Sequence, residues 1–152
     1  MLDLWRLLSD DEFMDPHQLH LEPLNLFGPG ATFHHVGLAV RAIDDLGIAE
    51  LKKVHDPIQK VSVAFVDLHG TCLEFIEPAA GDSPVTASLK KGIKLVHLCV
   101  EVPDLEKAIH FAETQGLRQL SLPAPAVAFG GRLIVWLFHP TYGLFELLEK
   151  RG

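Results

Sequence analysis

The sequence predicts an α+β protein built from two similar halves, each with the approximate element order βαβββ. A strand that contains a histidine opens each half, at His35 and His97, and a strand that contains a glutamate closes each half, at Glu74 and Glu146. Between these strands, segments with helical spacing and segments with alternating polarity follow in the same order twice. We assign residues 1–30 to an N-terminal arm and residues 31–152 to one domain, with module one at 31–80 and module two at 92–150.

The arm differs in composition from the rest of the chain. Residues 3–14 have the pattern of a short amphipathic helix, and a loop rich in proline and glycine follows up to Gly30. The arm carries too many large hydrophobic residues for a solvated extension. We therefore expect it to cover module one, either within the chain or across a homodimer.

Module one is expected to start with a strand at Phe33–Val40. A short helix can fit within Asp44–Val54, and Pro57 would end it. Two further strands, Val61–Leu68 and Thr71–Glu77, are joined by His69-Gly70, which is a hairpin signal. After this module, Val85–Lys90 can form one or two helical turns.

Module two repeats this order more fully. A strand is expected at Leu95–Val102, followed by a helix that starts at Pro103-Asp104 and ends at Gly116. The remaining elements are a strand near Arg118–Leu122, a loop from Pro123 to Gly131, and strands at Arg132–Phe138 and Gly143–Leu148. By comparison, module one has lost a strand or part of its helix.

Length and charge exclude several classes of function. A chain of 152 residues can bury a real core, and its formal net charge of −7 argues against nucleic acid, whose phosphates need a basic surface. No apolar run approaches the roughly 18 residues of a membrane span, so no membrane partner is expected. Cys72 and Cys99 lie in strand-like runs as free thiols, and the first residues lack the basic start of a secretory signal. We therefore expect a cytoplasmic protein.

The paired histidines and glutamates are candidate metal ligands. Because side chains alternate along a strand, His35 shares a face with Gly37 and Ala39, while His34 faces the other way with Val36. A bare imidazole or carboxylate on an apolar face costs several kcal/mol unless it is paired or bound to a metal. Taken singly, each residue is more readily explained as a hydrogen-bonded or solvated side chain. Together, two imidazoles and two carboxylates suit a divalent transition metal.

A series of short motifs resembles the vicinal oxygen chelate superfamily, and within it most closely the methylmalonyl-CoA epimerases. The strand His35-Val36-Gly37-Leu38-Ala39-Val40 is similar to the opening His-Ile-Gly-Ile-Ala-Val of that family. The similarity extends over about residues 33–149. The other matching segments are, in order, Lys60–Val66, Gly70–Pro78, Asp82–Val85, Val96–Val102, Gly130–Arg132, His139-Pro140 and Leu144–Leu147.

This resemblance implies two βαβββ modules that pair into a cupped mixed sheet around one divalent metal ion. The residues at the matching ligand positions are His35, Glu74, His97 and Glu146. Glu146 also matches a ligand that can act as the catalytic base. The ion could be Co, Zn, Ni or Mn, and the implied partner is a small-molecule acyl thioester, with the protein as a homodimer. Three features depart from the family: the segment 41–60 is short, the turn from Pro140 to Glu146 is short, and the region 60–66 offers Ser62 where a second carboxylate is customary.

Three functions agree with these observations. The first is a metal-dependent epimerase or isomerase that acts on a 2-substituted malonyl-type acyl thioester through a metal-stabilised enolate. The second is another metal-dependent superfamily activity, either a glyoxalase-type lyase or a dioxygenase. The third is a non-catalytic binding or accessory domain. Metal content separates the third from the others, and deuterium exchange into an acyl thioester separates the first from the second.

Overall fold

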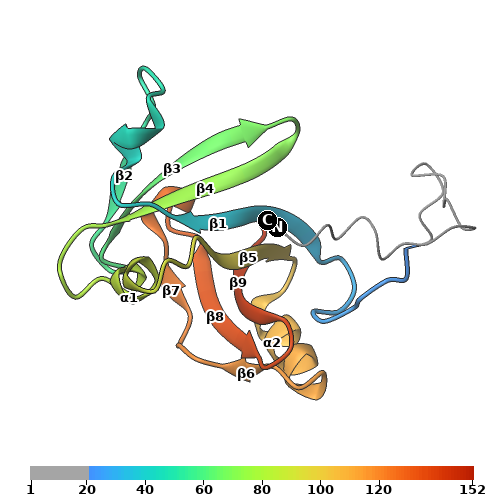
Figure 1. The fold of residues 1–152 in the computed structure, drawn as a ribbon. Coiled ribbons are helices and arrows are strands. Elements are labelled where there is room, and N and C mark those ends of the chain that lie inside the picture. Colours follow the sequence, from blue (N-terminus) through green and yellow to red (C-terminus); the bar gives the residue numbers. More distant parts are fainter. Residues whose placement is uncertain (1–20) are drawn as a thin grey trace, which may run out of the picture.

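The computed structural model describes residues 21–152, and its nine strands form one strongly curved mixed sheet (Figure 1). The elements of module one are β1 (Thr32–Ala39), the 3-10 helix η2 (Ile43–Leu46), β2 (Val54–Asp56), β3 (Val61–Leu68) and β4 (Thr71–Pro78). Helix α1 (Val85–Lys90) follows module one. The elements of module two are β5 (Leu95–Val102), α2 (Leu105–Thr114), β6 (Arg118–Gln119), β7 (Ala124–Pro125), the 3-10 helix η3 (Val127–Phe129), β8 (Leu133–His139) and β9 (Gly143–Glu149).

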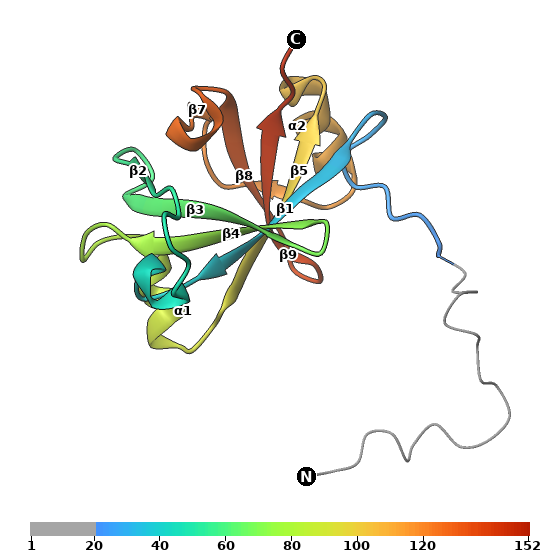
Figure 2. The same ribbon diagram turned by 90° about the horizontal axis from the view of Figure 1, so that it is seen from above.

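The strand order is symmetric about the β1–β5 pair. Across the sheet it reads β2-β3-β4-β1-β5-β9-β8-β6, with β7 paired to β8. β1 is parallel to β4, β5 is parallel to β9, and β1 and β5 are antiparallel to each other. Seen from above, the strands fan out from this centre and α2 lies outside the curve (Figure 2). The predicted α+β class and its two modules are confirmed.

Module one is shortened in its helix and keeps all four strands. The helix expected within Asp44–Val54 is wrong in length, because only the four-residue η2 forms. Gly47 ends η2 in the left-handed conformation (φ 66°), and its N–H donates to the Asp44 carbonyl at 3.2 Å. Lys53 then pairs with Glu77 of β4 (Nζ–Oε1 3.0 Å), so the segment that follows η2 stays close to the sheet.

The β3–β4 hairpin forms where it was predicted. His69 and Gly70 have φ values of 50° and 92°, which is the backbone that a two-residue type I′ turn requires. Both strands extend from this turn in register, from Leu68 opposite Thr71 to Val61 opposite Pro78.

Helix α2 begins and ends where the sequence indicated. Asp104 caps its start by accepting a hydrogen bond from the Lys107 N–H at 3.0 Å, and Gly116 follows its end with φ 88°. The strand expected near Arg118–Leu122 is shorter, because the Trp136 N–H donates to the Ser121 hydroxyl (3.1 Å) instead of continuing the ladder. The predicted loop after Pro123 contains β7 and η3.

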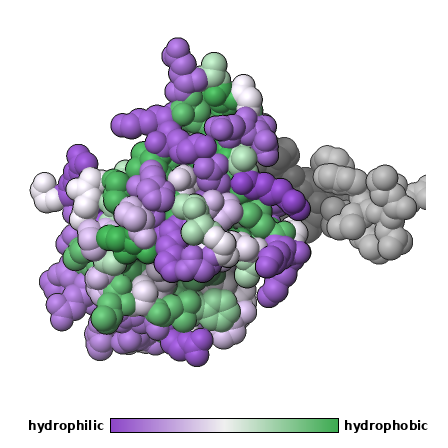
Figure 3. Space-filling model, turned by 90° about the vertical axis from the view of Figure 1, so that its left-hand side faces the viewer, coloured by the Kyte–Doolittle hydropathy of each residue, from purple (hydrophilic) through white to green (hydrophobic). Residues whose placement is uncertain are grey.

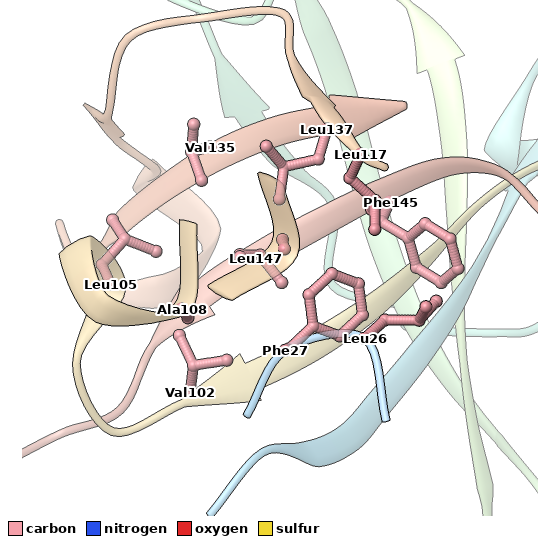
Figure 4. Packing of buried hydrophobic residues seen from close by; sticks show 11 residues of the cluster. Leu26, Phe27, Val102, Leu105, Ala108, Leu117, Val135, Leu137, Phe145 and Leu147 are labelled. Carbon is pink, nitrogen blue, oxygen red and sulfur yellow. The ribbon is translucent and has the colours of Figure 1, made fainter. Parts of the chain in front are cut away.

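The main core lies in module two, and the end of the arm belongs to it. Leu26 and Phe27 are buried there, and the Phe27 ring meets Phe145 edge-on at 5.1 Å (Figure 4). The described end of the arm therefore packs on module two, which differs from the expected contact with module one. The helix expected at 3–14 lies outside the described residues, and the boundary of the arm at residue 30 stays a prediction.

The convex face of module one is largely apolar, and the residues that the structure describes cover it only in part. Helix α2 covers the corresponding face of module two, whereas in module one the described element beside β4 on this face is the short η2. Phe33 and Leu95, on the two central strands, are 55% and 57% exposed. The neighbouring residues on this face are partly buried and apolar: Val36, Leu38, Val66, Leu73 and Phe75.

Within residues 21–152 no helix has the length and apolar character that a membrane span requires. The face shown in Figure 3 mixes hydrophilic side chains with separate hydrophobic areas. Cys72 and Cys99 are both free thiols.

Candidate metal centre

Four buried side chains from the four central strands meet on the concave face of the sheet. They are His35 on β1, Glu74 on β4, His97 on β5 and Glu146 on β9, and we call them the His–Glu quartet. Their residues are 0%, 6%, 3% and 3% exposed. All four sequence-predicted site residues are therefore brought together.

Strand register explains why these positions converge. Gly37 of β1 lies opposite both Glu74 of β4 and His97 of β5. By the pseudo-twofold, Cys99 of β5 lies opposite both His35 and Glu146. Each module therefore supplies one histidine and one glutamate around the central strand pair.

The distances within the quartet are those of neighbouring ligands on one ion. His35 Nε2 lies 3.1 Å from His97 Nε2, 3.1 Å from Glu74 Oε2 and 3.4 Å from Glu146 Oε2. His97 Nε2 lies 3.2 Å from both carboxylate oxygens. Bonds of about 2.0–2.2 Å to a divalent ion separate adjacent ligand atoms by roughly 3.0–3.5 Å in octahedral or tetrahedral geometry. The residues present therefore fit such an ion.

One oxygen of the quartet also lacks a conventional partner. Glu146 Oε2 is buried and makes no contact with hydrogen-bond geometry, despite its short distances to both histidines. A buried carboxylate oxygen without a hydrogen bond is costly. Coordination of a cation would remove this cost.

Burial and ion pairing shift the pKa values of the quartet side chains in opposite directions. Burial alone would lower the pKa of His97, but the Glu146 and Glu74 carboxylates outweigh it and raise this pKa to about 9. The same balance raises the pKa of His35. Burial alone would raise the pKa of Glu74, but His35 and His97 lower it to about 2, and they also lower the pKa of Glu146. A metal ion must therefore displace a proton from His97 at neutral pH.

Gly37 makes room for His97. A Cβ atom at Gly37 would lie 2.2 Å from His97 Cε1, a distance that no side chain tolerates. The edge of the His97 ring also meets Trp136 of β8, with ring centroids 4.9 Å apart. A glycine inside a strand commonly marks such a close approach, and this is the sequence signal for its role.

His34 does not face away from the site, which corrects the expectation from simple alternation. Phe33 pairs with Val100 and His35 pairs with Cys99, so His34 is the extra residue of a β-bulge. The bulge places His34 Nδ1 2.9 Å from His35 Nδ1. Cys99 Sγ also lies within 4.8 Å of both rings, and burial raises the pKa of this thiol.

Three members of the quartet, Glu74, His97 and Glu146, line a mostly apolar cavity of about 310 Å³. Its polar lining, apart from quartet members, consists of Asp56, Gln59 and Ser88, and no lysine or arginine lines it within residues 21–152. The apolar lining includes Val61, Val63, Ile76, Phe129, Ile134 and Trp136. Such a cavity suits a ligand with an alkyl group near the ion.

Ser62 does not point into this cavity. Val61 and Val63 of β3 line it, whereas Ser62 lies on the opposite face beside His55 (Oγ–Nδ1 3.3 Å). On β3, where the resemblance implied a second carboxylate, the residues toward the cavity are therefore valines.

Sequence reasoning missed the residues that close the cavity between the modules. Asp56 of β2 accepts hydrogen bonds from the Ile58 and Gln59 N–H groups (2.9 and 3.0 Å) and from the Val127 N–H of η3 (3.1 Å). Trp136 Nε1 donates to Gln59 Oε1 at 3.3 Å. The available signals were Asp56 before Pro57, typical of a turn, and one tryptophan in a strand. Neither signal indicates a contact with the other module.

Residues 30–135 match the family model of the Glyoxalase/Bleomycin resistance protein/Dioxygenase superfamily. The chain belongs to this superfamily. The predicted resemblance to vicinal oxygen chelate proteins is thereby confirmed, and the quartet occupies the concave face of a superfamily fold.

Relatives within the superfamily include named epimerases. Mitochondrial methylmalonyl-CoA epimerase from Mus musculus is 32% identical over 117 residues, which cover 70% of this chain and 65% of that protein. The match thus spans slightly less than two thirds of the mouse protein. YqjC from Bacillus subtilis (strain 168), an uncharacterized protein, is 35% identical over 129 residues, covering 78% of this chain and 91% of that protein.

A solved structure of an epimerase shares the fold. Methylmalonyl-CoA epimerase from Mycobacterium tuberculosis superposes with a TM-score of 0.66 at 22% sequence identity, covering 88% of this chain and 95% of that chain. At this identity the likeness shows the vicinal oxygen chelate fold.

Proposed function

We propose that the chain is a metal-dependent epimerase of a 2-substituted malonyl-type acyl thioester. The observation that carries the proposal is the convergence of His35, Glu74, His97 and Glu146 on one point, where the last three residues line an apolar cavity. The names of the epimerase relatives supply the substrate class. A glyoxalase-type lyase or a dioxygenase remains the alternative within the superfamily, and a dioxygenase needs only two histidines and one carboxylate.

The quartet would hold the ion. Two imidazoles and two carboxylates accept Co, Zn, Ni or Mn, and availability decides among them. A bound divalent ion would supply Lewis-acid stabilisation of the negative charge that develops on the substrate carbonyl. The two carboxylates balance the charge of the ion, so the filled centre stays neutral in the apolar cavity.

Glu146 is the proposed base. Glu146 lines the cavity, and its carboxylate has two oxygens, so one oxygen would bind the ion while the other would accept the proton. The apolar walls exclude water and favour transfer of the substrate α-proton to this oxygen. Inversion would need a second base on the other face of the substrate. Glu74 would be occupied as a ligand of the ion. The Asp56 carboxylate already accepts hydrogen bonds from three N–H groups, and the residue that β3 presents to the cavity is Val63. Exchange of the α-proton is therefore expected to be faster than inversion.

The test is solvent-deuterium exchange into methylmalonyl-CoA by the metal-loaded protein, followed by mass spectrometry. We expect exchange by the wild-type protein and its loss in Glu146→Gln, with the fold retained by circular dichroism. Glu149→Gln on the same strand is the matched control and should exchange normally. Absence of exchange by fully loaded wild-type protein would overturn the epimerase assignment. Absence of any bound ion after reconstitution would overturn the metal centre as well.

We also propose a homodimer that forms through the convex face of module one, in a reducing compartment such as the cytoplasm. Phe33 and Leu95 are more than half exposed and lie among partly buried apolar neighbours, and contiguous apolar surface commonly marks an interface. The two free cysteines support a reducing compartment, because thiols stay unpaired there.

A further inference from the structure

We propose that His34 is a positioning residue for His35. It accepts a hydrogen bond from His35 Nδ1–H and thereby directs the Nε2 lone pair of His35 toward the metal ion. This inference rests on the proposed function, because it requires that the quartet binds a divalent ion.

The bulge in β1 creates the contact. Adjacent residues of a regular strand point to opposite faces, so a direct bond between their rings needs an irregular backbone. At His34 the pairing with β5 skips one residue, and the two Nδ1 atoms approach to 2.9 Å. Phe129 holds both rings: it is stacked against His35 at 5.8 Å and meets His34 edge-on at 5.6 Å.

The chemistry of the pair favours one direction for the hydrogen bond. A histidine that binds a metal through Nε2 must carry its proton on Nδ1, and the partner at Nδ1 fixes this tautomer. His34 Nδ1 lies 2.9 Å from His35 Nδ1, and only one of the two nitrogens can be the donor in this contact, so a proton on His35 Nδ1 makes His34 Nδ1 the acceptor. His35 then donates and His34 accepts.

The other histidine of the quartet has no such partner. The pseudo-twofold places a second bulge in β5, where Val96 is skipped before His97. Valine cannot accept a hydrogen bond, and no partner for His97 Nδ1 is seen among residues 21–152. The His97 ring is positioned by packing: Gly37 leaves room for it, and the Trp136 ring contacts it. Of the two quartet histidines, only His35 therefore has a polar partner at Nδ1 among the described residues, and this partner is His34.

The test compares cobalt(II) affinity in full-length variants, with a chelator as competitor and the visible spectrum of bound cobalt as a second readout. His34→Phe keeps a ring but removes the acceptor, and it should weaken binding about ten- to 100-fold and change the cobalt spectrum. His34→Asn places an amide oxygen near the position of Nδ1, and it should restore both affinity and spectrum. His110→Phe, an exposed histidine on α2, is the matched control and should behave as wild type.

The outcomes separate this inference from the proposed function. If the wild-type protein binds cobalt and His34→Phe binds it equally well, His34 has no positioning role and the metal centre stands. If the wild-type protein binds no ion, the metal centre itself is wrong. Should His34→Phe fail to fold, nitrogen NMR of zinc-loaded wild-type protein still decides the question. A proton on His35 Nδ1 supports the inference, whereas zinc bound at that nitrogen, beside His34 and Cys99, overturns it.

Discussion

The close approach at Gly37 and the bulge at His34 shape the surroundings of the quartet. The four ligands were predictable because a histidine and a glutamate recur at equivalent places in two similar halves. The role of Gly37 and the inward turn of His34 were not predicted. The position of His34 depends on a β-bulge, and the role of Gly37 depends on its close approach to His97. The alternation of side chains along a strand predicts neither. Asp56 was missed for a related reason, since its partner Val127 is 71 residues away.

Replacement of Gly37 by alanine tests the shape of the site. The new Cβ would lie 2.2 Å from the His97 ring, so the ring or the β1–β5 pair must move. We expect a loss of about 1–3 kcal/mol in the free energy of unfolding and weaker metal binding, as for other overpacked cores. Urea denaturation and calorimetric titration measure the two effects. Gly81→Ala is the control, because its Cβ would meet no atom within 4 Å. Wild-type behaviour of Gly37→Ala would contradict this account of His97.

The metal-free protein should be most stable between about pH 4.5 and 6.5. The pKa of His97 is raised from 6.5 to about 9, so its contribution to stability is complete below pH 6.5 and is lost as the pH rises through 9. The pKa of Glu74 is lowered from 4.5 to about 2, so its contribution is present above pH 4.5 and is lost as the pH falls toward 2. Urea midpoints in EDTA across this range measure the profile.

Metal loading should reverse the alkaline part of this profile. Ligand histidines must be deprotonated, so stabilisation by zinc should grow with pH up to about 9. The comparison is a second series of midpoints with excess zinc. Parallel profiles with and without zinc would show that the quartet is not the binding site.

At the scale of elements, local signals predicted most strands, and tertiary contacts decided the rest. The β3–β4 hairpin and β5 followed from alternation and from a two-residue turn. The helix expected within Asp44–Val54 failed because Gly47 ends it after four residues. Strand β6 is short because the Ser121 side chain replaces a ladder bond, which no periodicity reveals.

Asp56 joins β2 to η3 and should contribute measurably to stability. Replacement by alanine leaves the N–H groups of Ile58, Gln59 and Val127 without their acceptor. We expect a loss of about 1–3 kcal/mol in the free energy of unfolding. Asp56→Asn keeps one oxygen acceptor and should lose less. Asp67→Ala in the exposed β3–β4 turn is the control, because its contact with the Gly70 N–H is solvated. Equal losses of unfolding free energy in Asp56→Ala and Asp67→Ala would show that the contact between Asp56 and η3 adds no stability.

At the scale of the whole molecule, the missing helix of module one leaves an apolar convex face, and this face is where the proposed dimer would form. The double variant Phe33→Glu with Leu95→Glu should turn a dimer into a monomer, because it places two charges on the apolar face. Light scattering after size-exclusion chromatography gives the mass. Leu122→Glu, at an 83% exposed site in module two, should leave the mass unchanged. A wild-type monomer, or a double variant that remains dimeric, would refute this interface.

The division of the quartet between the two modules has a consequence for assembly. Each module supplies only one histidine and one glutamate, so neither module alone can bind an ion tightly. An ion bound by all four side chains would link the two modules and would be released only when the modules separate. A chain severed in the turn at 79–84 would then re-form its central strand pair far more tightly with the ion than without it, by simple mass action. The two halves would remain one protein although the peptide link between them was gone.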